Sequence, residues 1–150
     1  MELRYEPATA ADIDLIFDLN KQLICQYEDL RAINLEQVLA WVMRKITNHI
    51  GSYTRILCQG ELAGYYRLVP NGEEQELDDF YVLPEFQGKG IGSVVLRHCC
   101  DTEKTVMLYV FIKNQRAIAL YQRFGFDKSE TVDATRIIMR RVPGNRLEVL

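Results

Sequence analysis

The order of hydrophobic and polar positions divides the chain into strand-like and helix-like segments. Residues 3–9, LRYEPAT, alternate apolar and polar side chains as a half-buried first strand does. Apolar residues then recur at helical spacing in residues 13–27 and again in residues 35–46, which predicts two helices. Thr9 and Asn34 stand before these segments, and their side-chain oxygens are typical caps for a helix start.

From residue 53 the pattern changes to the period of strands. Three runs, YTRILC, LAGYYRLV and EQELDDFYV, are separated by the turn signals Gln59-Gly60-Glu61 and Pro70-Asn71-Gly72. We therefore expect three consecutive antiparallel strands.

The second half of the chain alternates helices and strands. The pattern predicts a helix in 91–99, a doubly buried strand in TVMLYVFI, a helix in 114–124 ended by Gly125, and two final strands joined near Asp133. The resulting order is β-α-α-β-β-β-α-β-α-β-β, and residues 143–150 form a short tail. It predicts a single mixed α/β domain over residues 1–150, with a mostly antiparallel central sheet and helices on both faces.

Composition narrows the range of functions. A formal charge of -3 and no basic patch argue against nucleic acid or an anionic membrane as partner. We find no signal peptide and no apolar run long enough to cross a bilayer, and expect a cytoplasmic protein. The four cysteines lack C-x-x-C spacing and should be reduced core thiols, and the two histidines lack ligand-spaced partners, so we expect no metal. We interpret the basic pairs 44–45 and 140–141 as solvated.

The segment VLPEFQGKGIGSVVL, residues 82–96, places a glycine-rich turn between a strand and a helix. Gly88, Gly90 and Gly92 let a ligand approach the backbone, where N–H groups and the helix dipole favour an anion. Gln87 and Lys89 flank this turn. A Walker A loop requires Ser or Thr after its Gly-Lys, and the dinucleotide fingerprint G-x-G-x-x-G is also incomplete. We therefore expect a phosphate ligand of another kind.

Two motifs in sequence order resemble the GCN5-related N-acetyltransferase (GNAT) family. QGKGIG matches the cofactor motif of that family at Gln87, Gly90 and Gly92. The later segment NQRAIALYQRFGF matches its second signature at five positions, namely Asn114, Ala117, Tyr121, Gly125 and Phe126. The resemblance extends over residues 3–141 and is strongest in residues 76–126.

The resemblance implies that the protein binds acetyl-coenzyme A (acetyl-CoA). In the family, the pyrophosphate lies on the backbone amides of the glycine turn, and the pantetheine arm follows the preceding strand where a bulge splays the two central strands apart. No metal is implied. Carried over to this sequence, the cofactor residues are Phe80, Tyr81, Val82, Gln87, Gly88, Lys89, Gly90, Ile91, Gly92, Ser93, Asn114, Ala117 and Tyr121.

Transfer of an acetyl group to an amine requires a base and an acid, because an alkylammonium must lose a proton before it attacks and the thiolate gains one. The resemblance implies Glu76 as the base and Tyr121 as the acid, with the Phe80 backbone N–H stabilising the oxyanion. Strand alternation predicts that Glu76, Asp78 and Phe80 share one face, so Asp78 is a substitute base. Asp79 falls on the other face, where we expect a cap or a salt bridge.

We therefore predict an acetyl-CoA-dependent N-acetyltransferase that joins a primary amine directly to the acetyl group. The amine, a small molecule or a peptide, would be attracted by the acidic cluster Glu73, Glu74, Glu76 and Asp78, and Tyr27 and Glu28 would form part of its binding wall. The alternatives are a transferase for another acyl-CoA and an acyl-CoA-binding sensor without turnover. The last strand pair and the tail could join a homodimer. The motifs do not specify the amine.

Overall fold

The computed structural model describes residues 1–144. The strands are β1 (Leu3–Pro7), β2 (Tyr53–Cys58), β3 (Glu61–Asn71), β4 (Glu74–Val82), β5 (Val106–Phe111), β6 (Asp127–Thr131) and β7 (Arg136–Arg141). The helices are α1 (Ile13–Tyr27), α2 (Leu35–Asn48), α3 (Ile91–Cys99) and α4 (Gln115–Arg123), with short 3-10 turns at Ala10–Asp12, Ile50–Ser52 and Pro84–Phe86. The predicted order of elements is confirmed.

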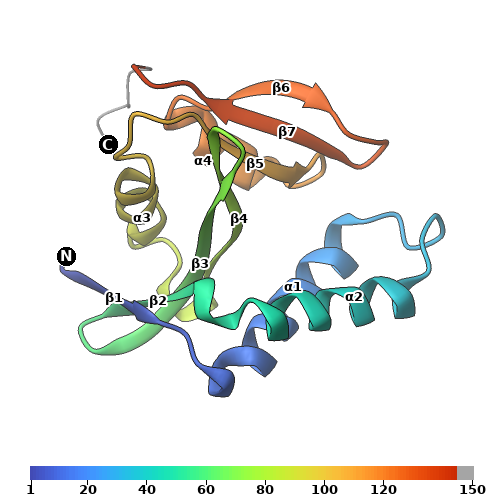
Figure 1. Ribbon diagram of the computed structural model, residues 1–150, viewed down its shortest axis with the longest axis horizontal. Helices are drawn as coiled ribbons and strands as arrows, with labels where there is room; N and C mark the ends of the chain where they lie inside the picture. Colours follow the sequence, from blue (N-terminus) through green and yellow to red (C-terminus); the bar gives the residue numbers. More distant parts are fainter. Residues whose placement is uncertain (145–150) are drawn as a thin grey trace.

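A seven-stranded sheet in the order β1-β2-β3-β4-β5-β7-β6 runs through the molecule (Figure 1). Every neighbouring pair is antiparallel except β4 and β5, which are parallel. The β4–β5 pairing covers Gln75↔Val106 and Glu76↔Met107, after which β4 continues to Val82 without β5 beside it. The two central strands therefore part, as the family resemblance implied.

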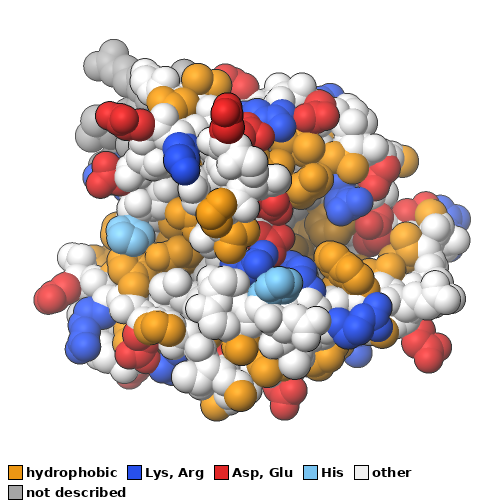
Figure 2. Space-filling model, in the orientation of Figure 1, with side chains coloured by type: hydrophobic (Ala, Val, Ile, Leu, Met, Phe, Trp, Pro, Cys, Tyr) orange, Lys and Arg blue, Asp and Glu red, His pale blue; other side chains and the backbone are white. Residues whose placement is uncertain are grey.

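Helices cover both faces of the sheet and divide the hydrophobic core into two parts. On one face, Ile16 of α1 and Ile46 of α2 are fully buried against Tyr53, Tyr65 and Tyr81 of the sheet. On the other face, α3 and α4 pack on β4, β5 and β7. Figure 2 shows one face of the molecule hollowed between β5–β7 and the α1–α2 pair, where acidic and basic side chains meet beside hydrophobic ones.

Local signals in the sequence place several boundaries correctly. The Asn34 side chain accepts a hydrogen bond from the Gln37 N–H at 3.1 Å and caps α2, as predicted. The first hairpin turn consists of Gln59 and Gly60, both with positive φ, which is the geometry that joins two strands by two residues. Gly125 ends α4 with φ +84°. These features depend on neighbouring residues, which is why the sequence reveals them.

The predicted alternation of side chains along β4 is wrong because the strand contains a bulge. Arg67 of β3 pairs with Asp79, and the next residue of β3 pairs with Leu77, so Asp78 is an extra residue in β4. Leu77 consequently lies in the core with Phe80 on the α3 side. Asp78 and Asp79 both reach Lys45 on the other side.

Three further expectations about single side chains are corrected. Lys45 is not solvated, since its side chain is 15% exposed and ion-paired, and Arg141 is buried with its guanidinium bonded to the Phe124 carbonyl. Cys25 is exposed and not a core thiol, although Cys99 and Cys100 are buried. Most of the predicted tail, residues 145–150, lies outside the described residues. Within residues 1–144, no helix has the length and hydropathy that a membrane span requires.

Candidate active site

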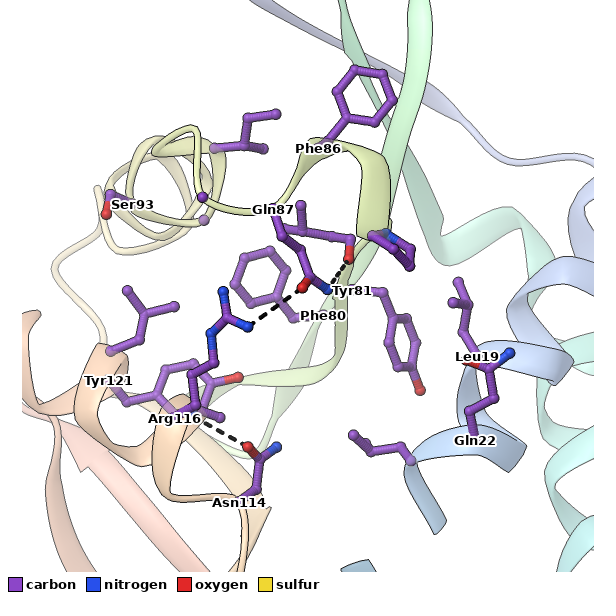
Figure 3. A pocket seen from close by; sticks show the side chains of 18 of the residues that line it. Leu19, Gln22, Phe80, Tyr81, Phe86, Gln87, Ser93, Asn114, Arg116 and Tyr121 are labelled. Atoms are coloured by element: carbon purple, nitrogen blue, oxygen red, sulfur yellow. Dashed lines mark hydrogen bonds between the residues drawn. The ribbon is translucent and has the colours of Figure 1, made fainter. Parts of the chain in front are cut away.

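A cleft of about 560 Å³ opens where β4 and β5 part. Its walls come from α1, the last residues of β4, the glycine turn, the start of α3 and one face of α4 (Figure 3). It contains every cofactor residue implied by the resemblance except Lys89. The lining residues are Leu19, Gln22, Leu23, Gln26, Tyr27, Phe80, Tyr81, Val82, Pro84, Phe86, Gln87, Gly88, Gly90, Ile91, Gly92, Ser93, Asn114, Arg116, Ala117, Leu120, Tyr121 and Arg123.

The glycine turn presents backbone donors to this cleft. Gly88 and Gly90 have φ +76° and +81°, a region that side chains disfavour, and Gly90 is the cap from which α3 begins. The first N–H groups of α3 have no acceptor within the helix, and the helix dipole places partial positive charge there. The turn therefore forms a site suited to an anion.

The edge of β4 that faces β5 supplies a second kind of contact. In the described part of the chain, no strand pairs with this edge from Leu77 to Val82. An extended, amide-rich ligand can hydrogen-bond to such an edge as an added strand would. At its end, Gln87 Nε2 donates to the Val82 carbonyl oxygen at 3.0 Å.

Two arginines on α4 line the cleft, and the sequence prediction missed both. Arg116 lies 3.4 Å from the Gln87 side chain, beside the glycine turn (Figure 3), and Arg123 is two turns further along α4. Their spacing of seven residues, with Leu120 between them, places them on one face of α4 and could have identified them. Arg116 adds fixed positive charge beside the anion site, and Arg123 adds it further along the cleft.

Tyr121 and Asn114, both from the second motif, line the cleft. The Asn114 side chain accepts from the Ala117 N–H at 3.2 Å and caps α4. The ring of Tyr121 packs against Phe126 at 5.7 Å between centroids. Burial raises the pKa of Tyr121, and the nearby charge of Asp79 raises it further, so its phenol keeps its proton at neutral pH.

The acidic residues predicted to attract the amine do not line the cleft. Glu76 is half-buried at the last paired position of β4 and β5, and it accepts from Asn71 Nδ2 at 3.1 Å. Burial raises the pKa of Glu76, and the charge of Asp78 adds to this effect. Glu74 is bonded to Arg140 at 2.8 Å. Of the two residues predicted for the amine-binding wall, Tyr27 lines the cleft and Glu28 does not.

Asp78 is held in ion pairs. Its Oδ2 lies 2.8 Å from Lys45 Nζ and 2.9 Å from Arg67 Nη1. Burial alone would raise the pKa of Asp78, but Lys45 and Arg67 outweigh it and lower the pKa. A carboxylate stabilised in its charged form is a weak base, so the geometry opposes the role of substitute base that the sequence suggested.

Possible metal ligands are the next feature of the described residues. Among residues 1–144, no cluster of three or more His, Cys, Asp or Glu side chains has the arrangement of a metal site. His49 caps the end of α2, and His98 stacks on Tyr5 with ring centroids 4.4 Å apart. Each histidine therefore makes a contact that belongs to the fold itself.

The sequence is similar to those of known acetyltransferases. The chain is 35% identical over 89 residues to the spermine/spermidine N(1)-acetyltransferase of Bacillus subtilis, covering 50% of this chain and 59% of that protein. It is 40% identical over 80 residues to the mycothiol acetyltransferase of Streptomyces coelicolor, covering 48% of this chain and 26% of that protein. The matched part is thus less than two thirds of either relative.

Solved structures share the fold over nearly the full length. The PaiA N-acetyltransferase of Thermoplasma acidophilum, in complex with coenzyme A, superposes with a TM-score of 0.69 at 19% identity, covering 95% of this chain and 99% of that chain. The ribosomal-protein-S18-alanine N-acetyltransferase of Escherichia coli gives 0.64 at 19% identity, covering 97% and 96%. The family model for the acetyltransferase (GNAT) family matches residues 17–126, and the chain therefore belongs to this family.

Proposed function

We propose that the protein is an acetyl-CoA-dependent N-acetyltransferase that acts on a primary amine, a small molecule or the amino group of a peptide. The observation that carries this proposal is one cleft that joins the glycine turn, the unpaired edge of β4 and Tyr121. The relatives described above, which include a spermine/spermidine and a mycothiol acetyltransferase, support it. A cytoplasmic location and a homodimer stay predictions.

The donors of the cleft fit the chemistry of acetyl-CoA. The backbone N–H groups of residues 88–93 would hold the diphosphate, and Arg116 and Arg123 would add positive charge for its phosphates. The open edge of β4, Phe80–Val82, would pair with the amides of the pantetheine arm. When bound, acetyl-CoA supplies an activated acetyl thioester.

Tyr121 is the proposed acid. Its raised pKa keeps the phenol protonated, and its position on the cleft-facing side of α4 places it opposite β4. A phenol can donate its proton to a thiolate as that thiolate leaves, which lowers the barrier to departure. Asn114 fixes the start of α4 and so the direction from which Tyr121 enters the cleft.

Glu76 is the base that the family resemblance implies. The pKa of Glu76 is raised, which supports that role, because a general base works best when its pKa is near the pH of the reaction. Glu76 is outside the lining of the cleft, so it would act through water molecules placed between the parting strands. The substitution Glu76→Gln tests it.

The proposal predicts acetyl transfer from acetyl-CoA to at least one member of a panel of primary amines. Tyr121→Phe should lower kcat by about 100-fold, the lower end of general acid catalysis, with little change in KM for acetyl-CoA. Tyr109→Phe on β5, which is 45% exposed and outside the cleft, is the matched control and should keep full activity. Binding of CoA with no turnover on any amine would favour a sensor instead, and faster turnover with a longer acyl-CoA would favour another donor.

A further inference from the structure

Asp79 is a buried carboxylate that the proposed mechanism above does not use. It is 9% exposed and is contacted by side chains from three other elements. Its Oδ2 accepts from Tyr53 Oη at 2.5 Å, and Lys45 Nζ and Asn20 Nδ2 each lie 3.4 Å from the same oxygen. These contacts from β2, α2 and α1 fix the orientation of the carboxylate.

The other oxygen of Asp79 contacts a residue that lines the cleft. Oδ1 accepts from Tyr81 Oη at 3.2 Å. Tyr81 is 8% exposed and lines the cleft, where Figure 3 shows it between Phe80 and the α1 residue Leu19, with Tyr121 on the opposite wall. Tyr81 thus connects the buried carboxylate with the space in which an amine would react.

The charges around Asp79 determine how readily it takes a proton. Lys45 and, beyond Asp78, Arg67 are the cations on this side, Asp78 is the nearby anion, and Tyr53 and Tyr81 are the neutral phenols. Burial raises the pKa of Asp79, and the charge of Asp78 adds to this while Lys45 opposes it. The balance favours a carboxylate that is more basic than an exposed aspartate.

We infer that Asp79 and Tyr81 form a proton relay that deprotonates the acceptor amine. This inference rests on the proposed acetyltransferase function, and it assigns the deprotonation of the amine to Asp79 and Tyr81 in place of Glu76. The bond between nitrogen and one ammonium hydrogen breaks as Tyr81 Oη takes that proton, and Tyr81 passes its own phenolic proton to Asp79 Oδ1. The net change is one proton moved from the ammonium to Asp79, which leaves a neutral amine with a free lone pair. The proton returns to solvent after the amide has formed.

The bulge at Asp78 brings a second carboxylate beside the relay. In a regular strand, Leu77, Asp79 and Tyr81 would all lie on the same face. The extra residue moves Leu77 to the α3 side and brings Asp78 beside Asp79, where it raises the basicity of that carboxylate. Asp78 itself is neutralised by Lys45 and Arg67. The relay therefore assigns the two neighbouring carboxylates different roles.

The decisive experiment compares two amines of similar size, ethylamine and 2,2,2-trifluoroethylamine, at pH 7 and saturating acetyl-CoA. The fluorinated amine is uncharged at this pH and needs no base to expose its lone pair. Asp79→Asn and Tyr81→Phe should each lower kcat/KM for ethylamine by about 100-fold, while the values for trifluoroethylamine stay within a factor of about 3. The double variant should lose no more than either single variant, because both act in one relay.

Controls separate a relay from a structural role. Tyr65→Phe removes a buried phenol that donates to Asp12 at 2.6 Å outside the cleft, and it should leave both amines unaffected. Tyr81→Phe keeps the ring, so it provides the test if Asp79→Asn unfolds. Equal losses with both amines would overturn the relay, as would an amine-dependent loss in Glu76→Gln with none in Tyr81→Phe. A native protein that acetylates neither these amines nor any of the wider panel would instead count against the proposed function.

Discussion

At the scale of single residues, Gly64 shows how close packing positions the site. It pairs with Val82 across β3 and β4, and a Cβ built on Gly64 would lie 2.0 Å from the carbonyl oxygen of Tyr81. That oxygen belongs to the backbone and cannot move without moving Tyr81. The strand that carries the proposed relay can therefore approach β3 this closely because residue 64 has no side chain.

We predict that Gly64→Ala destabilises the protein by about 1–3 kcal/mol, the usual cost of forcing an atom into a packed region. Urea unfolding measures this loss. Gly51→Ala is the control, because a Cβ at Gly51 would meet no atom within 4 Å, and its unfolding free energy should stay near that of the native chain. Equal stability of the two variants would show that β3 and β4 are not in such close contact.

At the scale of elements, α2 is tied to β4 by charge as well as by packing. Lys45 of α2 reaches both Asp78 and Asp79, and its side chain is 15% exposed. Burial would lower the pKa of Lys45, but Asp79 and Asp78 outweigh burial and raise it. Because Asp78 also contacts Arg67 of β3, the bulge in β4 is held by cations from two neighbouring elements.

Lys45→Met should therefore cost about 3 kcal/mol at pH 7, because it leaves a largely buried carboxylate without one of its partners. The pKa of Asp78 is lowered in the fold, so its stabilisation is present above the unfolded value of ~3.9 and lost as the pH falls through the lower folded value. The pKa of Lys45 is raised, so its part is lost only in strong base, as the pH rises through the folded value.

The difference in unfolding free energy between native protein and Lys45→Met should thus be largest near neutral pH and shrink below about pH 4. Urea unfolding at several pH values measures it. Lys21→Met, on an exposed position of α1, should have no such pH-dependent effect. A cost for Lys45→Met that stays constant down to strong acid would mean that packing of its alkyl chain, and not the ion pair, stabilises this contact.

At the scale of the whole molecule, the cleft lies where separate parts of the fold meet. One wall belongs to α1, which packs with the first half of the sheet, and the opposite wall belongs to α4, which packs with β5 and β7. A ligand that spans the cleft contacts both walls and the strand edge between them. Its binding energy should therefore stabilise the fold as a unit.

We predict that CoA at about 100 times its Kd adds about 2.7 kcal/mol of stability and raises Tm by roughly 5–10 °C. Thermal unfolding with and without CoA measures this shift. Arg116→Ala should reduce it at the same CoA concentration, because the variant removes a cation from beside the glycine turn. An equal shift with ATP or NAD would contradict a site selective for CoA.

Much of this protein follows from its sequence alone. The order of the elements, the helix caps at Asn34 and Asn114, and the turn at Gly90 depend on residues a few positions apart, so short-range patterns reveal them. The two motifs also identify the glycine turn and Tyr121 as candidate site residues, each within its own element. These features are local, and local chemistry determines them.

The tertiary structure decided the rest. The bulge at Asp78 depends on how β4 pairs with β3, and it reversed the expected face of Leu77. The sequence pattern predicted a solvated Lys45 and gave Asp79 no role in the chemistry. In the fold, Lys45 contacts Asp78 and Asp79, which are 33 and 34 positions away along the chain. Burial and pairing across such separations set the charge of a carboxylate and its access to the cleft, because both depend on neighbours that only the folded chain supplies.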